Sequence, residues 1–106
     1  MPKEITSASF ESDVLQSSKP VVIDFYAEWC GPCQQMAPHF DELANELKES
    51  YSLVKINIDE QRDIAIAHAI SSIPTLVFYK NGAKVAVEGG YLDKTELKKK
   101  IQEHLG

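Results

Sequence analysis

The sequence is poor in cysteine and tryptophan, and it has no long apolar run. Its 106 residues include two cysteines and one tryptophan, which excludes the dense disulfide framework of small secreted domains. No apolar run approaches the roughly 20 residues that a membrane-spanning helix needs, and the first residues lack the apolar core of an export signal. We therefore expect a cytoplasmic protein that does not enter a membrane.

Basic residues are also scarce. Eleven of them stand against sixteen acidic residues, so the net charge is -5. A nucleic acid or an anionic membrane surface would repel such a chain, and neither is expected as the main partner. Internal repeats, low-complexity tracts and linkers are absent as well. The length suits one domain, residues 1–106, with its own apolar core.

Both cysteines lie in the stretch Trp29-Cys30-Gly31-Pro32-Cys33, between an apolar run and a helical pattern. Two residues three positions apart at a helix start share one face, where their Cα atoms can meet the separation that a disulfide requires. The unpaired N–H groups of the first helical turn favour a thiolate at Cys30. Pro32 fits this turn because its missing N–H is not needed there. The pattern predicts a dithiol that can close, open and exchange.

Two other interpretations of the cysteine pair are weaker. A structural zinc site needs four protein ligands, and the chain offers two thiols and the histidines His39, His68 and His104, none at finger or ribbon spacing to the pair. No metal site is therefore expected. A permanently closed structural bridge is rare in the cytoplasm, where a lone C-x-x-C is more often catalytic or metal-binding.

Two apolar periodicities alternate along the chain and predict an α/β fold. Pro38 interrupts the longest helical pattern, but the apolar spacing continues beyond it, so a kink is expected rather than an end. The order β-α-β-α-β-α-β-β-α implies a mixed sheet with helices on both faces. The expected strands are 4–6, 21–26, 53–59, 75–80 and 84–87, and the expected helices are one that ends near residue 15 and those at 32–48, 61–69 and 93–105.

Polar residues mark several of the expected element ends. Ser7 or Ser9 is expected to cap the first helix. The dipeptide Asn81-Gly82 is a favoured two-residue turn between the last two strands. Asp93 and Glu96 have the spacing of a capping box, which predicts the start of the last helix.

Several motifs, in order and over nearly the whole chain, resemble the thioredoxin family. A lone C-x-x-C would be weak evidence, whereas the whole set is specific. The resemblance implies a thioredoxin fold of the α/β class, with a central mixed β-sheet of about five strands flanked by four helices. The motifs are Ile23-Asp24-Phe25, Ala27-Glu28-Trp29-Cys30-Gly31-Pro32-Cys33, Ala37-Pro38, Lys55-Ile56-Asn57-Ile58-Asp59, Ile73-Pro74-Thr75-Leu76, Lys80-Asn81-Gly82 and Gly90.

The same resemblance implies a thiol–disulfide oxidoreductase that reduces disulfides in other proteins. Cys30 would attack as the nucleophile and Cys33 would resolve the mixed disulfide. Gly31-Pro32 resembles the reducing members, whereas the oxidising and isomerising relatives usually carry a histidine between the cysteines. Electrons are expected from a separate thioredoxin reductase, with no bound cofactor, and the protein is expected to be a monomer. The alternative from another class is a non-catalytic binding subunit, whose partner binding would survive loss of both thiols.

Asp24 and Lys55 interrupt two apolar strands. The residues alone leave open whether Asp24 faces water or is buried, since ionisable groups are seldom fully buried. By resemblance, Asp24 is the family's buried acid beneath Cys33, and Lys55 is its partner. Burial would raise the pKa of Asp24 and the ammonium would lower it. Such an acid can accept the proton of Cys33 and later return one to the leaving thiol.

Pro74 is ambiguous from the residues alone, because most X–Pro bonds in folded proteins are trans. The resemblance implies instead a cis bond between Ile73 and Pro74, in a turn that faces the cysteines. The Ile73 backbone could then pair with an extended substrate segment. The substrate-docking surface implied by the resemblance consists of Trp29, Gly31, Pro32, Ile73, Pro74, Gly90 and Tyr91.

Overall fold

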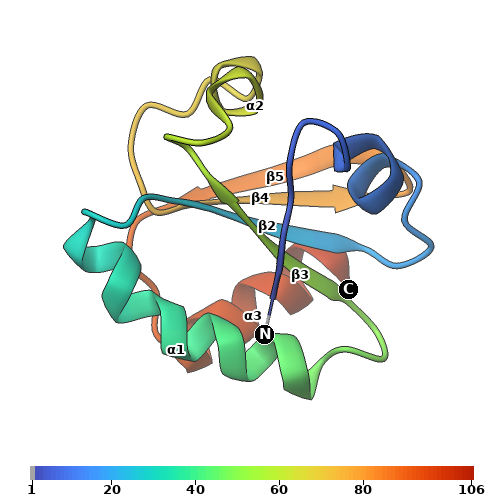
Figure 1. Cartoon of the computed structure of the whole chain (residues 1–106). Helices are drawn as coiled ribbons and strands as arrows, with labels where there is room; N and C mark the ends of the chain where they lie inside the picture. The colour runs from blue at the N-terminus through green and yellow to red at the C-terminus, as the bar shows by residue number, and fades with distance from the viewer. Residues whose placement is uncertain (1) are drawn as a thin grey trace.

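The computed structural model describes residues 2–106, and these form one five-stranded sheet in the order β1-β3-β2-β4-β5. Helices cover both faces of this sheet (Figure 1), and the expected mixed α/β architecture is confirmed. The strands are β1 (Lys3–Glu4), β2 (Val21–Tyr26), β3 (Ser52–Asn57), β4 (Thr75–Lys80) and β5 (Ala83–Gly89). The helical segments are η1 (Glu11–Leu15), α1 (Gly31–Glu46), α2 (Arg62–Ala67) and α3 (Lys94–Leu105).

The central strand, β2, leads the chain toward the cysteines. It runs parallel to β3, where Asp24 lies opposite Lys55, and antiparallel to β4, where Asp24 lies opposite Leu76. The short β1 extends the parallel part and places Glu4 opposite Lys55. It ends at Glu4, two residues earlier than expected. After β2, only a short loop separates Tyr26 from the start of α1.

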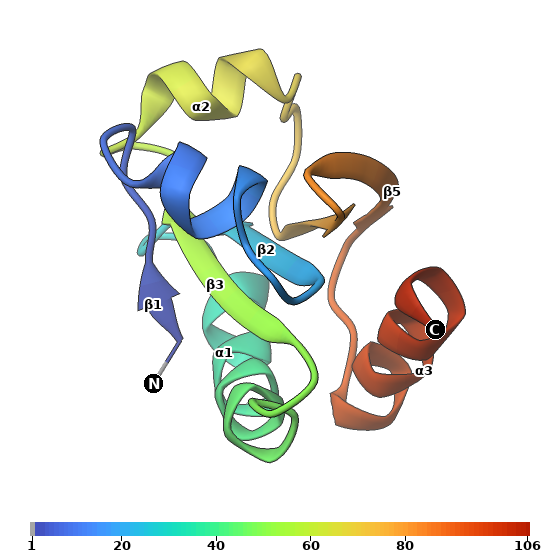
Figure 2. The ribbon, with the colours of Figure 1, turned by 90° about the vertical axis from the view of Figure 1, so that its right-hand side faces the viewer.

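Successive side chains of β2 point to opposite faces of the sheet, so this strand contributes to two apolar layers. Segments η1 and α2 cover one face, and α1 and α3 lie together on the other (Figures 1 and 2). All six residues of β2 are buried, which confirms the prediction of a strand buried on both faces. The η1 side includes Val14, Ile23, Phe25, Ile56 and Ile64, and the α1 side includes Val22, Met36, Phe40, Leu76, Leu97 and Ile101.

Helix α1 continues past Pro38 to Glu46, as its apolar spacing indicates. Met36, Phe40 and Leu43 keep one face of this helix buried on both sides of the proline. Packing of that face outweighs the loss of one backbone hydrogen bond at Pro38. The helix ends two residues before the expected position.

The expected serine cap of the first helix is wrong. Segment η1 is a π-helical turn with Phe10 at its N-cap and no side-chain cap. Ser9 Oγ instead accepts a hydrogen bond from the Thr6 backbone N–H at 3.0 Å. The Ser7 N–H donates at 2.9 Å to Oε1 of Gln61, which is distant in the sequence. Both serines therefore stabilise the loop before the helix.

Two other element ends differ from expectation for local reasons. Strand β3 stops at Asn57 because its Oδ1 accepts the backbone N–H groups of Asp59 and Glu60, at 2.9 and 3.2 Å, which turns the chain out of the sheet. Helix α2 stops at Ala67, shortly before Ala69 adopts a φ of 55°. A left-handed residue of this kind cannot continue a right-handed helix.

The other turn and cap signals are confirmed. Asn81 and Gly82 have φ values of 54° and 78°, as a tight hairpin turn between β4 and β5 requires. The Asp93 side chain accepts the N–H of Glu96 at 2.9 Å, and the Glu96 carboxylate accepts the N–H of Asp93 at 3.0 Å. This capping box starts α3.

Candidate active site

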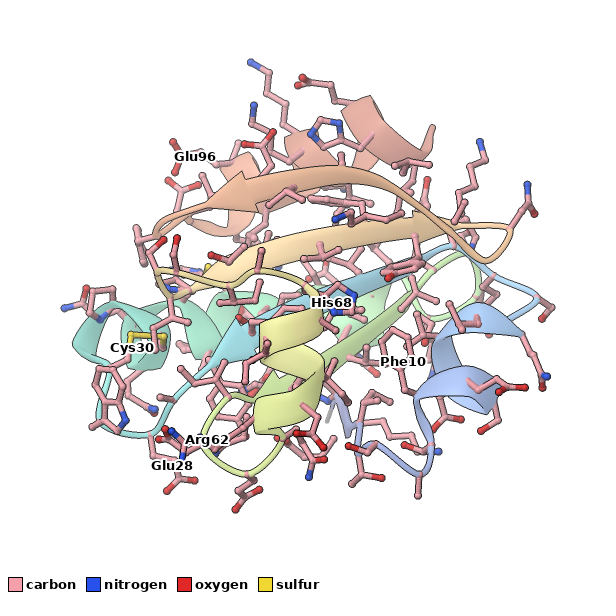
Figure 3. All side chains as sticks on the ribbon, turned by 90° about the horizontal axis from the view of Figure 1, so that it is seen from above. Phe10, Glu28, Cys30, Arg62, His68 and Glu96 are labelled. Carbon is pink, nitrogen blue, oxygen red and sulfur yellow. A yellow bond between two sulfur atoms is a disulfide. The ribbon has the colours of Figure 1, made fainter. Side chains whose placement is uncertain are left out.

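The two cysteines form a disulfide at the start of α1 (Figure 3). Their Cα atoms lie 5.2 Å apart, within the range that the bond allows. Cys30 is the N-cap of the helix, and its Sγ accepts a hydrogen bond from the Cys33 backbone N–H at 3.2 Å. The same N–H would stabilise a thiolate at Cys30 after reduction. The geometry predicted from the spacing is confirmed.

The disulfide is enclosed on most sides. Cys30 is 5% exposed and Cys33 is 2% exposed, so Cys30 is the more accessible of the two. Both pack with Tyr26 and Ala27 at the carboxyl end of β2. The Ile73 carbonyl oxygen lies 3.8 Å from Cys30 Sγ. The loop before β4 and the start of α1 therefore both lie against Cys30.

The loop before β4 lies beside the cysteines, as the resemblance implies. The Ile73–Pro74 bond is cis, so the resemblance predicted its geometry correctly where the general preference for trans would not. The Gly90 N–H donates to the Pro74 carbonyl oxygen at 2.9 Å. This bond ties the end of β5 to the same loop. Three segments that are distant in sequence therefore meet around Cys30.

The expected docking residues differ in exposure. Trp29 is 71% exposed and Tyr91 is 43% exposed, while Ile73 is half-buried and Pro74 is buried. Pro74 therefore supports this surface from beneath. Tyr91 follows β5, and its hydroxyl lies 3.2 Å from Nε2 of His39 on α1. The remaining members, Gly31, Pro32 and Gly90, are exposed.

The orientation of Trp29 depends on a residue that sequence reasoning missed. Its indole N–H donates to Asp59 Oδ2 at 2.8 Å. Asp59 follows β3 and Trp29 follows β2, and these strands are parallel neighbours. Residues after the carboxyl ends of neighbouring parallel strands meet at one edge of a sheet. That placement was the signal in the sequence that could have identified the pair.

Asp24 is fully buried, which answers the question that the residues left open. Neither carboxyl oxygen has a hydrogen-bond partner within the described residues 2–106. Burial raises the pKa of Asp24 from 3.8 to about 7, against the lowering effect of Lys55, while Glu4 and Asp41 raise it further. Asp24 is therefore a carboxyl group that exchanges its proton near neutral pH.

Lys55 lies opposite Asp24 in the sheet, as expected of its partner. Its ammonium does not donate a hydrogen bond to Asp24 in the part of the chain that the structure describes. Instead, Lys55 Nζ lies 4.4 Å from the centroid of the Tyr26 ring. The influence of Lys55 on Asp24 is therefore an electrostatic one at longer range.

Sequence reasoning also missed the surroundings of Tyr26. The Tyr26 hydroxyl donates to Glu4 Oε2 at 2.7 Å. Burial, followed by this contact with Glu4, raises the pKa of Tyr26 above its usual range. On α1, Asp41 has a buried Oδ1 without a hydrogen-bond partner among the described residues. No local pattern identifies these groups, because they come from separate elements.

Within residues 2–106, no group of three or more His, Cys, Asp or Glu side chains is placed to hold a metal ion. The helices within these residues are too short or too polar to cross a lipid bilayer.

Comparison with known proteins assigns the fold and the site to a family. The Thioredoxin family model matches residues 1–103. Thioredoxin 1 of Synechococcus elongatus is 43% identical over 101 residues, which cover 95% of this chain and 94% of that protein. The thioredoxin of Haemophilus influenzae is 44% identical over 101 residues, with the same coverage of 95% and 94%. That of Acidithiobacillus ferridurans is 46% identical over 93 residues, covering 88% and 86%. The chain therefore belongs to the thioredoxin family and is an oxidoreductase that reduces protein disulfides through the Cys30–Cys33 pair.

Proposed function

We propose that Cys30 is the attacking thiolate of this disulfide reductase and that Cys33 is the resolving thiol. The observation that carries this assignment is the hydrogen bond from the Cys33 backbone N–H to Cys30 Sγ at the start of α1. A helix start stabilises negative charge on the sulfur that it faces. The greater exposure of Cys30 supports the same order of reaction.

The reaction transfers two electrons from the dithiol to a substrate disulfide. The Cys30 thiolate attacks one sulfur of the substrate, a mixed disulfide forms, and the other substrate sulfur leaves as a thiolate. Cys33 loses its proton and attacks Cys30 Sγ. The Cys30–Cys33 disulfide forms and the second substrate sulfur leaves, so the substrate is reduced and the dithiol is oxidised.

Asp24 is proposed as the group that accepts the proton of Cys33. Its pKa of about 7, raised by burial, leaves both the acid and the carboxylate populated near neutral pH, which suits an acceptor that must later release the proton. Asp24 lies two residues before Tyr26, and Tyr26 belongs to the same buried cluster as the two cysteines. Lys55 is proposed to keep this pKa from rising further.

Substrate proteins are proposed to dock over Trp29, Ile73 and Tyr91 around Cys30, with the Ile73 backbone against an extended substrate segment. The reduced state is proposed to be regenerated by a separate thioredoxin reductase, without a cofactor bound to this chain. A cytoplasmic location and a monomeric state remain predictions from the sequence. The first can be checked by fractionation of the source cells and the second by sedimentation equilibrium.

The assignment of the two thiols can be tested by trapping. Cys30→Ser should abolish reduction of a disulfide-bonded test protein, whereas Cys33→Ser should accumulate mixed disulfides at Cys30. Non-reducing electrophoresis and mass spectrometry identify the trapped sulfur. The variant without either thiol is the control for non-covalent association. Equal trapping by either single variant would overturn the assignment.

The role of Asp24 can be tested by stopped-flow measurement of the resolution step. Asp24→Asn should slow attack by Cys33 on a preformed mixed disulfide between Cys30 and a fluorescent peptide thiol, by up to about 10²–10⁴-fold. The deficit should shrink as pH rises, because hydroxide can then deprotonate Cys33. The exposed α2 residue Asp63, changed to Asn, is the matched control. Superimposable pH profiles of the wild type and Asp24→Asn would show that the proton leaves by another route.

A further inference from the structure

Four side chains from three neighbouring strands gather on the α1 side of the sheet. The parallel register places Glu4 of β1 and Asp24 of β2 on either side of Lys55 of β3. Register partners in parallel strands point to the same face, and residues two apart on a strand do so as well. Tyr26, two residues after Asp24, therefore shares this face with the other three.

Contacts within this group fix the position of the ammonium. Lys55 Nζ lies 4.4 Å from the centroid of the Tyr26 ring, a distance at which the ring face attracts a cation. The ring itself is held by a hydrogen bond and by packing. Its hydroxyl donates to Glu4 Oε2 at 2.7 Å, and Tyr26 lies in one buried cluster with Ala27 and the two cysteines. A lysine side chain is otherwise flexible, with four rotatable carbons and a strongly hydrated head.

We propose that Tyr26, held in place by Glu4, is a positioning residue that keeps the Lys55 ammonium near Asp24 and thereby sets how readily Asp24 gives up its proton. This inference rests on the proposed role of Asp24 in the resolution step. It adds Tyr26 and Glu4 to that role, although neither touches the reacting sulfur atoms through a polar group.

The charges that face Asp24 make the position of Lys55 decisive. Glu4 from β1 and Asp41 from α1 both raise the pKa of Asp24, and Lys55 from β3 lowers it. On the remaining side, β4 places the apolar Leu76 opposite Asp24. Of these four groups, Lys55 is the one that carries a positive charge and lowers the pKa of Asp24. Its effect depends on distance, and a buried site screens that effect less than water does.

The proton affinity of Asp24 can be read directly by a carbon-13 NMR titration of its carboxyl group in the oxidised protein. Tyr26→Leu removes the ring and releases the ammonium to water, so the pKa of Asp24 should rise by about one unit. Tyr26→Phe is the matched control, because it keeps the ring and should shift the pKa less. An unchanged Asp24 pKa in Tyr26→Leu would overturn the proposal.

A double variant separates positioning from a general effect of burial. Lys55→Met alone should raise the pKa of Asp24. If Tyr26 acts through Lys55, then Tyr26→Leu should add no further shift in the Lys55→Met background. A rise of the same size in both backgrounds would mean that Tyr26 acts on Asp24 without Lys55, and a fall would mean that Tyr26 acts by shielding Asp24 from water. Either result would overturn the positioning role.

Glu4 offers a second test at an exposed strand residue, which does not depend on removal of a buried ring. Glu4→Gln and Glu4→Ala both remove the negative charge, but only Gln keeps an oxygen to accept the Tyr26 hydroxyl. The pKa of Asp24 should fall in Glu4→Gln and should be higher in Glu4→Ala than in Glu4→Gln. Equal values in the two variants would show that the hydrogen bond does not position Lys55.

The same variants distinguish this inference from the proposed role of Asp24. The rate of mixed-disulfide resolution is measured against pH beside each NMR titration. If the Asp24 pKa moves as expected and the midpoint of the rate profile moves with it, both proposals are supported. If the pKa moves and the rate profile does not, positioning is supported and Asp24 is not the proton acceptor. If the pKa does not move, positioning is overturned, whatever the rates show.

Discussion

Glu88 on β5 and His104 near the end of α3 are joined by a hydrogen bond of 2.7 Å, from His104 Nε2 to Glu88 Oε2. Lys100 Nζ lies 3.4 Å from the same carboxylate oxygen, and the His104 ring packs against Phe78 with centroids 4.8 Å apart. The hydrogen bond from His104 is the main reason that the pKa of Glu88 lies below its usual value. This cluster attaches α3 to the outer strand of the sheet, beside which it lies in Figure 2.

Removal of this carboxylate should weaken the fold in a pH-dependent way. Because the folded state lowers the pKa of Glu88, its stabilising contribution is complete above the ordinary value of 4.5 and is lost as pH falls through the folded pKa. Glu88→Gln should lower the free energy of unfolding at pH 6 by up to about 1 kcal/mol, and by less at pH 3. Urea unfolding measures both values.

The matched control is Glu103→Gln, which removes a more exposed partner of Lys100, 3.8 Å away. It should cost less than Glu88→Gln, because exposed ion pairs contribute little. The contrary outcomes are that the two variants lose the same free energy of unfolding, or that the loss in Glu88→Gln persists at pH 3. Either result would show that the stabilising effect of Glu88 does not come from its bond with His104.

Asp24 should have the opposite effect on stability. Its folded pKa of about 7 lies above the ordinary 3.8, so its favourable contribution is complete below pH 4 and is lost as pH rises to 7. Asp24→Asn should therefore be more stable than the wild type at pH 8, by up to about 4 kcal/mol. The two proteins should converge near pH 4. Urea unfolding measures the free energy of unfolding at each pH, with Asp63→Asn as the exposed control. The same pH dependence of stability in Asp24→Asn and Asp63→Asn would contradict this prediction.

Trp29 should report the state of the disulfide. It directly precedes Cys30, and its side chain is 71% exposed. Because a disulfide is an expected quencher of a nearby indole, dithiothreitol should change the emission of the chain's single tryptophan reversibly. Thiol titration confirms that the bond has opened. An open bond with unchanged emission would place the indole away from the sulfur atoms and would remove the central aromatic from the proposed docking surface.

Gly82 should be the least replaceable glycine of the hairpin. Its φ is 78°, and an added Cβ would lie 2.8 Å from the backbone carbonyl oxygen of Leu15. Gly82→Ala should therefore lower the free energy of unfolding by at least about 1–2 kcal/mol, seen as a lower Tm. Gly89→Ala is the control, because a Cβ there meets nothing within 4 Å. A Tm for Gly82→Ala equal to that of the control would show that the turn relaxes freely.

The sequence by itself determined the order and type of the elements and the redox pair. Burial on one or both faces repeats with the period of a helix or a strand, and this period is a local property of the chain. The Asn81-Gly82 turn and the Asp93–Glu96 capping box are also local, and both occur as expected. The cysteine pair is also a local feature, because a spacing of three residues at a helix start brings Cys30 and Cys33 to bonding distance.

The tertiary structure decided the surroundings of that pair. Strand order and register bring Glu4, Tyr26 and Lys55 together, and no local pattern contains this relationship. The burial of Asp24 depends on helix α1 covering the same face. The same physical reason explains why the predicted serine cap is wrong, because the Ser7 backbone N–H binds Gln61, which is far away in the sequence. Hydrogen bonds and electrostatic effects between distant segments depend on how the sheet is assembled, so the pKa of Asp24 could be known only from the folded chain.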